Sequence, residues 1–318
     1  MSVAEEYRKI YEKEICGEFK QEIAVYDEED EFYVYQPLSH NCTYSCTAGC
    51  NHDCYKRLGR LMRKNIIFYC YGEEEIVTKF KKGRLQDLAK AIKSAYRSRL
   101  PKRQPKQDGL PSEVLLDAII QSIVPDAYKI AVRTIFRQDD NNEIKGYDLT
   151  YFTNQDGEIT LWLGQAKLGG KQYCKNGILE DLKMKYEKLY LAKQIYFLAD
   201  KPMELTEEGK QIADLLDELN ILNADKSDNM RAERLMQFLA ENNIKICIPC
   251  LLAYEKKEVY RDISKLKEKV ESEIGWAKKV FKEHLQFNDI KPRLIFIIFP
   301  LDDVDALRGD EGFYAELC

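Results

Sequence analysis

The pattern of apolar and polar positions divides the chain into two parts. Apolar residues recur at helical spacing over residues 84–99, and this period predicts an amphipathic helix. The next segment, residues 100–109, is rich in proline, glycine and charge, which is typical of a boundary. We therefore expect an N-terminal α+β region over residues 1–100 and a second domain over residues 110–318. The strand-like stretches of the first region are residues 31–36 and 65–71.

The second part predicts an α/β fold. A helix begins at Leu110, with Pro111 and Ser112 in its first turn. Residues 154–157, Asn-Gln-Asp-Gly, predict a hairpin turn. The order of helix, three-strand meander, helix and strand predicts a mixed sheet, with a helical insertion at about 205–242. The expected strands are 131–137, 145–152, 159–167, 244–254 and 293–299, and the later helices are 178–198, 207–219, 229–242 and 256–285.

Composition places the chain among globular proteins. Its 318 residues are 45% hydrophobic, which is enough for a substantial core. No apolar run approaches the roughly 20 residues that cross a bilayer. The first residues are acidic and polar, unlike a secretion signal. These features predict a cytoplasmic protein without a membrane partner.

Charge is distributed unevenly along the chain. The formal net charge of -5 argues against a uniformly basic DNA-coating protein. Basic residues nevertheless gather between Lys79 and Lys106, where only Asp87 opposes them. Such a stretch suits a face that meets a polyanion, with Arg97 and Arg99 as candidate DNA contacts. A helix with a solvated basic face explains the same pattern equally well.

Four residues in the second part could carry phosphodiester chemistry. Asp148 lies on one predicted strand, and Gln165 and Lys167 project from one face of the next. A hairpin brings these three side chains together, and Glu113 on the preceding helix can point into the same site. A divalent metal held by such oxygens can activate water and neutralise the leaving oxygen. A lysine beside the metal can stabilise the developing charge.

The arrangement resembles known nucleases. Glu, Asp and Gln-Ala-Lys after a helix and a strand meander resemble the PD-(D/E)XK nuclease superfamily. More closely, Gly146-Tyr-Asp and residues 161–168, Leu-Trp-Leu-Gly-Gln-Ala-Lys-Leu, resemble the HamA family of Hachiman antiphage defence systems. Residues 248–254 and 297–302 fit the same family's strand pattern. The resemblance covers the chain from about Leu110 to the C-terminus.

The resemblance implies a fold, an activity and partners. The fold would be a restriction-endonuclease-like core with extra helices and an N-terminal extension that could dock a partner. The activity would be DNA hydrolysis that depends on Mg²⁺ or Mn²⁺ and is controlled by a HamB-like superfamily 2 helicase. Asp148, Gln165 and Glu113 would then be the metal ligands, and Lys167 the catalytic lysine. Lys171 and Lys175, beside a Gly-Gly pair, would contact DNA phosphates.

Gln165 departs from the family pattern, which usually has glutamate there. An amide oxygen can bind a hard cation but brings no charge, so metal affinity should fall. The glutamine is compatible with a natural variation and with an engineered exchange. Three hypotheses remain open: a general DNase, a weakened nuclease fold that binds DNA or tethers the helicase, and a site-specific restriction enzyme. No phosphate-loop sequence is present, so an ATP-driven step must come from another chain.

A regular cysteine series lies in the N-terminal region. Cys42, Cys46, Cys50 and Cys54 are separated by three residues each. The spacing falls in the range of zinc sites, and a structural Zn²⁺ is the preferred interpretation. Unligated thiols and a redox-responsive cluster are the alternatives. Cys247 and Cys250 lie in an apolar strand and are expected in the core.

Overall fold

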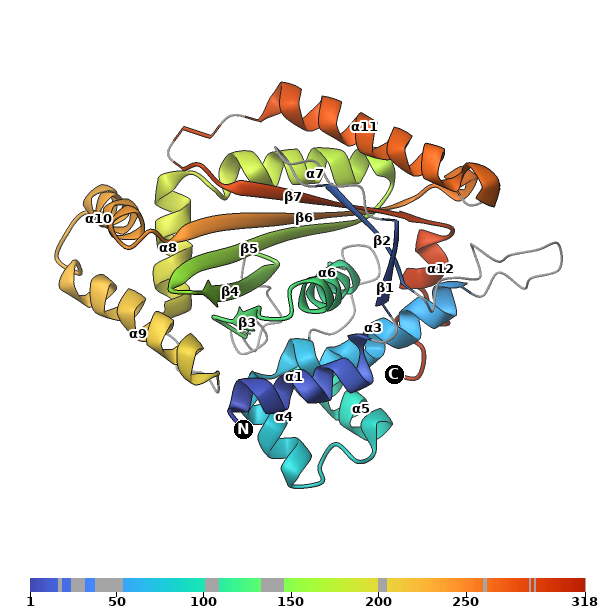
Figure 1. The fold of residues 1–318 in the computed structure, drawn as a ribbon, viewed down its shortest axis with the longest axis horizontal. Coiled ribbons are helices and arrows are strands. Elements are labelled where there is room, and N and C mark those ends of the chain that lie inside the picture. The colour runs from blue at the N-terminus through green and yellow to red at the C-terminus, as the bar shows by residue number, and fades with distance from the viewer. Residues whose placement is uncertain are drawn as a thin grey trace.

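The computed structural model describes residues 1–16, 19–23, 32–37, 54–100, 109–132, 146–199, 205–259, 262–285, 287–288 and 290–317. Within these ranges the chain forms a mixed α/β fold around a seven-stranded sheet with the order β1-β2-β7-β6-β5-β4-β3 (Figure 1). The strands are β1 (Phe19–Ile23), β2 (Phe32–Pro37), β3 (Tyr128–Lys129), β4 (Leu149–Gln155), β5 (Glu158–Gly169), β6 (Lys245–Glu255) and β7 (Arg293–Leu301).

Helices cover both faces of the sheet (Figure 1). Their bounds are α1 (Val3–Glu14), α3 (Cys54–Cys70), α4 (Glu73–Lys81), α5 (Leu88–Arg99), α6 (Leu110–Ile123), α7 (Lys171–Met184), α8 (Lys188–Ala199), α9 (Glu207–Leu222), α10 (Asp228–Glu241), α11 (Leu266–His284) and α12 (Val304–Arg308). None of these described helices combines the length and the apolar character of a bilayer span.

The sheet is parallel in its centre and antiparallel at both edges, and β1 pairs with β2 at one of these edges. β3, β4 and β5 form an antiparallel meander, whereas β5, β6 and β7 are parallel. β6 is buried along most of its length, as expected for a central parallel strand with helices on both faces. β2 pairs with β7 in parallel, so the N-terminal region contributes to the same sheet.

Alternate residues of β5 face two different cores. Trp162 and Ala166 belong to a core with α1, α3 and α6, while Leu161 and Leu163 belong to a core with α7, α8 and α11. Successive strand residues point to opposite faces, so residues 165 and 167 face α7. Figure 1 shows α6 and α7 on opposite sides of β5. The face of β5 on which a predicted site residue lies therefore decides which helix it can contact.

The predicted hairpin between the second and third strands of the meander is confirmed. Asp156 and Gly157 both have positive φ, 52° and 87°, which is the backbone of a two-residue turn that matches the sheet twist. The turn pairs Gln155 with Glu158 and, farther along, Leu149 with Gly164. This register determines which residue of β5 lies opposite Asp148.

Three predicted elements differ from the structure. Residues 65–71, predicted as strand-like, lie mainly in helix α3; a fully buried apolar run has no period that separates a strand from a helix. The helix predicted over 178–198 is two helices, α7 and α8. The strand predicted over 131–137 is absent from its two described residues, 131 and 132; a short strand, Tyr128–Lys129, precedes them, and residues 133–137 lie outside the described part.

Candidate functional site

Asp148 is fixed at the open end of the β4–β5 hairpin. Its backbone N–H donates to Gly164 O over 2.8 Å, which extends the antiparallel ladder by one residue. Its Oδ2 accepts a hydrogen bond of 2.8 Å from the N–H of Ala166. The side chain is half-buried, so the carboxylate is oriented by the backbone of β5 and still borders the surface. Asp148 therefore lies beside the strand that carries Gln165 and Lys167.

Gln165 and Lys167 point from β5 toward helix α7. Gln165 is fully buried. Lys167 runs along Gly177 of α7, where an added Cβ would lie 2.7 Å from Lys167 Cε. A glycine at this position lets the helix pack closely against the lysine stem. The predicted face-sharing of these two residues is confirmed.

Helix α7 brings an acid that the sequence analysis did not single out. Asp181 is 7% exposed, and its Oδ2 lies 2.6 Å from Lys167 Nζ. Its Oδ1 lies 3.0 Å from Nζ of Lys185, one helical turn later. Lys185 in turn donates a 2.7 Å hydrogen bond to Gln165 Oε1. The four side chains thus form a continuous chain of contacts.

The hydroxyl of Tyr186 lies at the buried end of this series of contacts, beside Gln165. Its hydroxyl donates to Leu163 O over 2.5 Å, and Gln165 Nε2 donates to the same hydroxyl over 3.5 Å. Burial raises the pKa of Tyr186 well above its ordinary value, so the ring stays a neutral donor. Both ends of the Gln165 amide are therefore oriented, the nitrogen by Tyr186 and the oxygen by Lys185.

Charge within the cluster is balanced. Burial by itself lowers the pKa of Lys167, but the carboxylates of Asp148 and Asp181 outweigh burial and raise the pKa above its ordinary value. Lys167 is consequently charged at neutral pH. Two carboxylates face two ammonium groups, Lys167 and Lys185, so the formal charges cancel. A glutamate at position 165 would make the cluster negative.

Glu113 lies in a different environment. It is buried in the first turn of α6, the helix on the other face of β5, and accepts a hydrogen bond from the hydroxyl of Tyr69 in α3. α6 packs against the face of β5 that carries Gly164, where an added Cβ would lie 3.0 Å from Leu116 Cδ2. The hydrogen bond described for Glu113 thus joins it to helix α3, and its participation in the site of Asp148, Gln165 and Lys167 stays a prediction.

The donor set can be tested against a divalent cation. Carboxylate and amide oxygens are the ligands that Mg²⁺ prefers, and Asp148 and Gln165 supply one of each. Within the described residues, no three His, Cys, Asp or Glu side chains are grouped so as to hold a metal ion. Asp181 Oδ2 is buried and pairs with Lys167 Nζ, and a carboxylate oxygen can accept from a second partner as well. Together with Asp181, the side chains of Asp148 and Gln165 offer the types of oxygen ligand that Mg²⁺ prefers.

The predicted DNA-contacting residues have unequal surroundings. Lys171 pairs with Glu273 and lies 3.8 Å from the centre of the Trp276 ring. Arg99 Nη2 lies 3.4 Å from Glu75 Oε1 and its guanidinium stacks on Tyr71, 4.9 Å from the ring centre. Both side chains therefore support packing within the chain. Lys175 is half-buried on α7.

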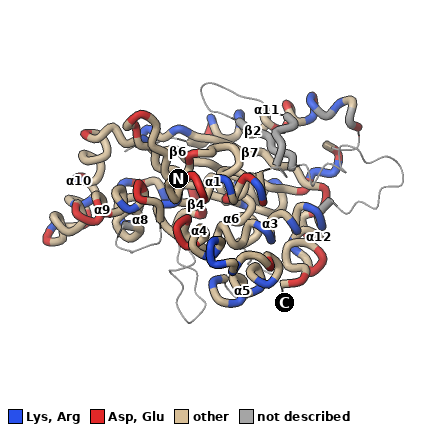
Figure 2. Tube along the Cα trace, turned by 60° about the horizontal axis from the view of Figure 1, so that its bottom comes forward, with Lys and Arg blue, Asp and Glu red and all other residues tan. Residues whose placement is uncertain are grey.

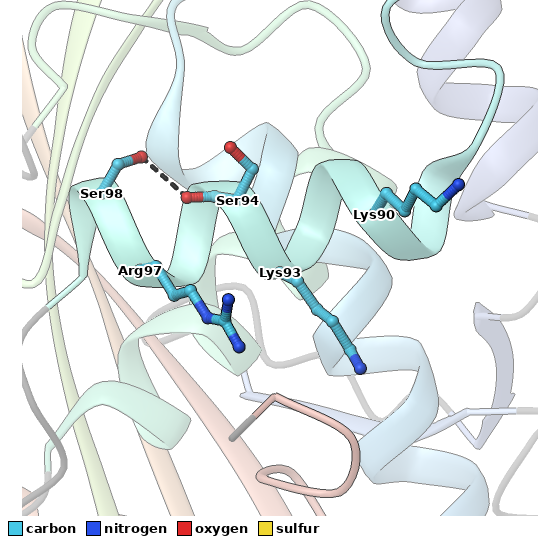
Figure 3. Close-up of a pocket in the computed structure, with 5 residues that line it drawn as sticks. All are labelled: Lys90, Lys93, Ser94, Arg97 and Ser98. Carbon is cyan, nitrogen blue, oxygen red and sulfur yellow. Dashed lines mark hydrogen bonds between the residues drawn. The ribbon is translucent and has the colours of Figure 1, made fainter.

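Arg97 belongs to an open basic face of α5. Figure 2 shows Lys and Arg residues along α5 and the turn before it. Lys90, Lys93, Ser94, Arg97 and Ser98 line a shallow pocket of about 470 Å³, seen in Figure 3. Lys90 forms a 3.1 Å ion pair with Asp87, the residue that caps the helix. Lys93 and Arg97 extend from the helix side by side (Figure 3).

A second pocket lies between α8, α9 and α10. Its volume is about 670 Å³, and its lining includes Met184, Leu189, Tyr190, Phe197 and Arg231. Aromatic and aliphatic groups dominate, and none of the nuclease-like residues borders it. Tyr190 of the pocket packs on Tyr147, the neighbour of Asp148, with ring centres 6.3 Å apart.

The cysteine predictions have separate outcomes. Cys42, Cys46 and Cys50, and the side chain of Cys54, lie outside the described part of the structure, so the zinc interpretation stays a prediction. Cys247 and Cys250 are buried in β6, which confirms the core assignment. Burial raises the pKa of both thiols, so they are inert as nucleophiles at neutral pH.

These observations define a mixed α/β protein whose β4–β5 hairpin carries a carboxylate, an amide and an ammonium group beside helix α7. A scan against protein families matches the HamA family over residues 6–317, and the chain belongs to that family, a component of Hachiman antiphage defence. The match includes the N-terminal region, where the sequence resemblance had not reached. Searches of curated proteins and of solved structures gave no match.

Proposed function

We propose that this chain is a DNA-hydrolysing subunit of a Hachiman antiphage complex and that Asp148, Gln165 and Lys167 form its active site on a restriction-endonuclease-like core. The observation that carries the proposal is the register of the β4–β5 hairpin, which puts Asp148 against the N–H of Ala166, between Gln165 and Lys167. An acid and a charged lysine beside one another are the groups that hydrolysis of a phosphodiester needs.

Each residue would have a distinct role. Asp148, oriented by the backbone of β5, would hold a hard cation. Lys167, kept charged by two nearby carboxylates, orients the attacking water and stabilises the negative charge that develops on the phosphate. A bound Mg²⁺ or Mn²⁺ supplies a water of lowered pKa and neutralises the leaving oxygen.

A basic surface lies on α5, on the face of the sheet opposite to α7. Lys93 and Arg97 on α5 offer a basic face that phosphates can contact without base specificity. Such contacts suit general DNA degradation better than site-specific restriction. A superfamily 2 helicase of the HamB type would control access to DNA, because this chain carries no phosphate-loop sequence of its own.

Plasmid degradation tests the proposal. The purified chain, alone and with its helicase partner, is incubated with supercoiled plasmid and Mg²⁺ or Mn²⁺. We expect Lys167→Ala to reduce the cleavage rate by about 100-fold or more, the usual loss of a group that stabilises transition-state charge. Lys183→Ala, an exposed lysine on the same helix α7, is the control and should cleave like the parent. Equal cleavage by Lys167→Ala and the parent would refute the assigned role.

A second candidate function is a nuclease fold that binds DNA or tethers the helicase without cutting. The balanced charges of the cluster and the hydrogen bond from Lys185 to Gln165 Oε1 favour it. It predicts that the parent leaves plasmid intact with both metals and with the helicase, while it still binds DNA.

A further inference from the structure

The acidic charge missing at position 165 has a candidate replacement on helix α7. Asp181 is 7% exposed and contacts Lys167 and Lys185, the two ammonium groups of the cluster. Its neighbour Glu180 is exposed on the same helix. Of these two acids, only Asp181 faces the site.

The buried carboxylate has an oxygen that is incompletely satisfied. Asp181 Oδ2 is buried, and the contact described for this oxygen is the 2.6 Å ion pair with Lys167 Nζ. A buried carboxylate oxygen without its full set of hydrogen bonds is costly, and a cation or its bound water can complete that set. Oδ2 has a second lone pair beside the one that Lys167 engages, and a ligand of the cluster could use it.

The carboxylates of Asp148 and Asp181 both lie close to the segment of β5 that carries Gln165. Asp148 Oδ2 accepts a hydrogen bond from the N–H of Ala166, and Asp181 Oδ2 lies 2.6 Å from Nζ of Lys167, so the two carboxylates contact the two residues that follow Gln165 in β5. Their negative charges thus converge on the Gln165 position from two sides, one from the hairpin and one from the helix. Nζ of Lys185 bridges Oε1 of Gln165 and Oδ1 of Asp181.

We infer that Asp181 is the second acidic residue of a divalent-cation site, supplying from helix α7 the charge that Gln165 lacks, and that the Lys185 ammonium occupies this site when no cation is bound. Two carboxylates and an amide oxygen, completed by waters, are a ligand set that Mg²⁺ and Mn²⁺ accept. Lys185 neutralises Asp181 and holds Gln165 Oε1, so a cation must displace it. The inference rests on the proposed nuclease function, but its direct test measures only the binding of a cation.

Calorimetric titration with Mn²⁺, without DNA, tests the inference on the full chain. We expect one Mn²⁺ site in the parent and an affinity lower by about 10-fold or more in Asp181→Asn, as a charged ligand is lost. Glu180→Gln is the matched control and should bind like the parent. In the double variant Gln165→Glu with Asp181→Asn, the charge returns to β5, and Mn²⁺ affinity should be restored.

A second variant covers the case in which Asp181→Asn does not fold. Lys185→Met removes the competing ammonium, so we expect tighter Mn²⁺ binding than in the parent, a gain that misfolding cannot produce. Lys183→Met, on the exposed side of α7, should leave the affinity unchanged. Parent-like binding in a folded Asp181→Asn, or unchanged or weaker binding in Lys185→Met, would overturn the inference.

Plasmid cleavage separates this inference from the proposed function. If the parent and Asp181→Asn cleave equally, the role of Asp181 as the second acidic ligand is refuted, while the nuclease assignment stands. If the parent binds Mn²⁺ through Asp148 and Asp181 but never cleaves, the cation site stands and the nuclease assignment fails. If the parent binds no Mn²⁺ in the millimolar range, the cation site is refuted whatever the plasmid result.

Discussion

Nζ of Lys185 lies 2.7 Å from Oε1 of Gln165, the oxygen that would face a metal if this residue were the usual glutamate. The contact links helix α7 to strand β5 and continues through Asp181 to Lys167. In the proposed site, this ammonium group would occupy the place of the cation. The charge at position 165 would then affect how easily a cation can enter.

Gln165→Glu should strengthen cation binding and raise cleavage. The substitution adds a negative charge to a cluster whose formal charges now cancel, and it leaves the side-chain length unchanged. We expect Mn²⁺ to be half-saturating for cleavage at a lower concentration than in the parent. A titration of cleavage rate against Mn²⁺ concentration measures this. A glutamate variant that needs more Mn²⁺ than the parent would contradict the assigned position of residue 165.

Gly177→Ala should lower cleavage without lowering stability. The new Cβ would lie 2.7 Å from Lys167 Cε, so the lysine must move away from its present position. Alanine is also favoured over glycine within a helix by roughly 1 kcal/mol. Gly275→Ala in α11 is the control, because an added Cβ there has no atom within 4 Å.

Both glycine variants are compared by thermal unfolding and by plasmid cleavage. We expect several-fold slower cleavage for Gly177→Ala and parent-like cleavage for Gly275→Ala. Unchanged cleavage in a folded Gly177→Ala would show that the position of the Lys167 stem is unimportant.

Removing Lys93 and Arg97 together should weaken DNA binding and its salt dependence. Each phosphate contact contributes about one unit to the slope of log affinity against log salt. If both residues contact phosphates, the double alanine variant should lose about two units of slope. Lys267→Ala is the control, since this exposed lysine lies on α11, which packs on the opposite face of the sheet from α5. Fluorescence anisotropy at several salt concentrations gives the slope, and an unchanged slope would exclude this face.

Alkaline pH should destabilise the fold in part through Cys174. Burial raises the pKa of this thiol from its ordinary value of 9.0 to about 12. Above pH 9 the unfolded chain loses this proton while the folded chain keeps it, so stability falls as pH rises toward 12. Below pH 9 both states hold the proton and the effect vanishes.

Urea unfolding at pH 8 and pH 10, under reducing conditions, measures this effect. We expect the fall in unfolding free energy between the two pH values to be smaller in Cys174→Ala than in the parent. The buried tyrosines titrate in both proteins and cancel in the comparison. An equal fall in both proteins would contradict the role of Cys174.

The hairpin that positions the site could be predicted from the sequence because its signals are local. Asp156-Gly157 determines the turn, the turn determines the register, and alternation places Gln165 and Lys167 on one face. The importance of Asp181 could not be predicted in this way. Charged residues on a helix are usually solvated, and only the packing of α7 on β5 shows that this acid is buried. Its i, i+4 spacing from Lys185, beside the apolar Leu182, is the one local hint.

Cleavage by Asp148→Asn tests the central claim most directly. The asparagine keeps an oxygen that can accept the hydrogen bond from Ala166, so the hairpin should fold, while the charge that attracts a cation is gone. Plasmid is incubated with Mn²⁺, the helicase partner and either the parent or the variant, with folding checked by circular dichroism. Our account predicts degradation by the parent and none by Asp148→Asn. Equal degradation by the two proteins would contradict it.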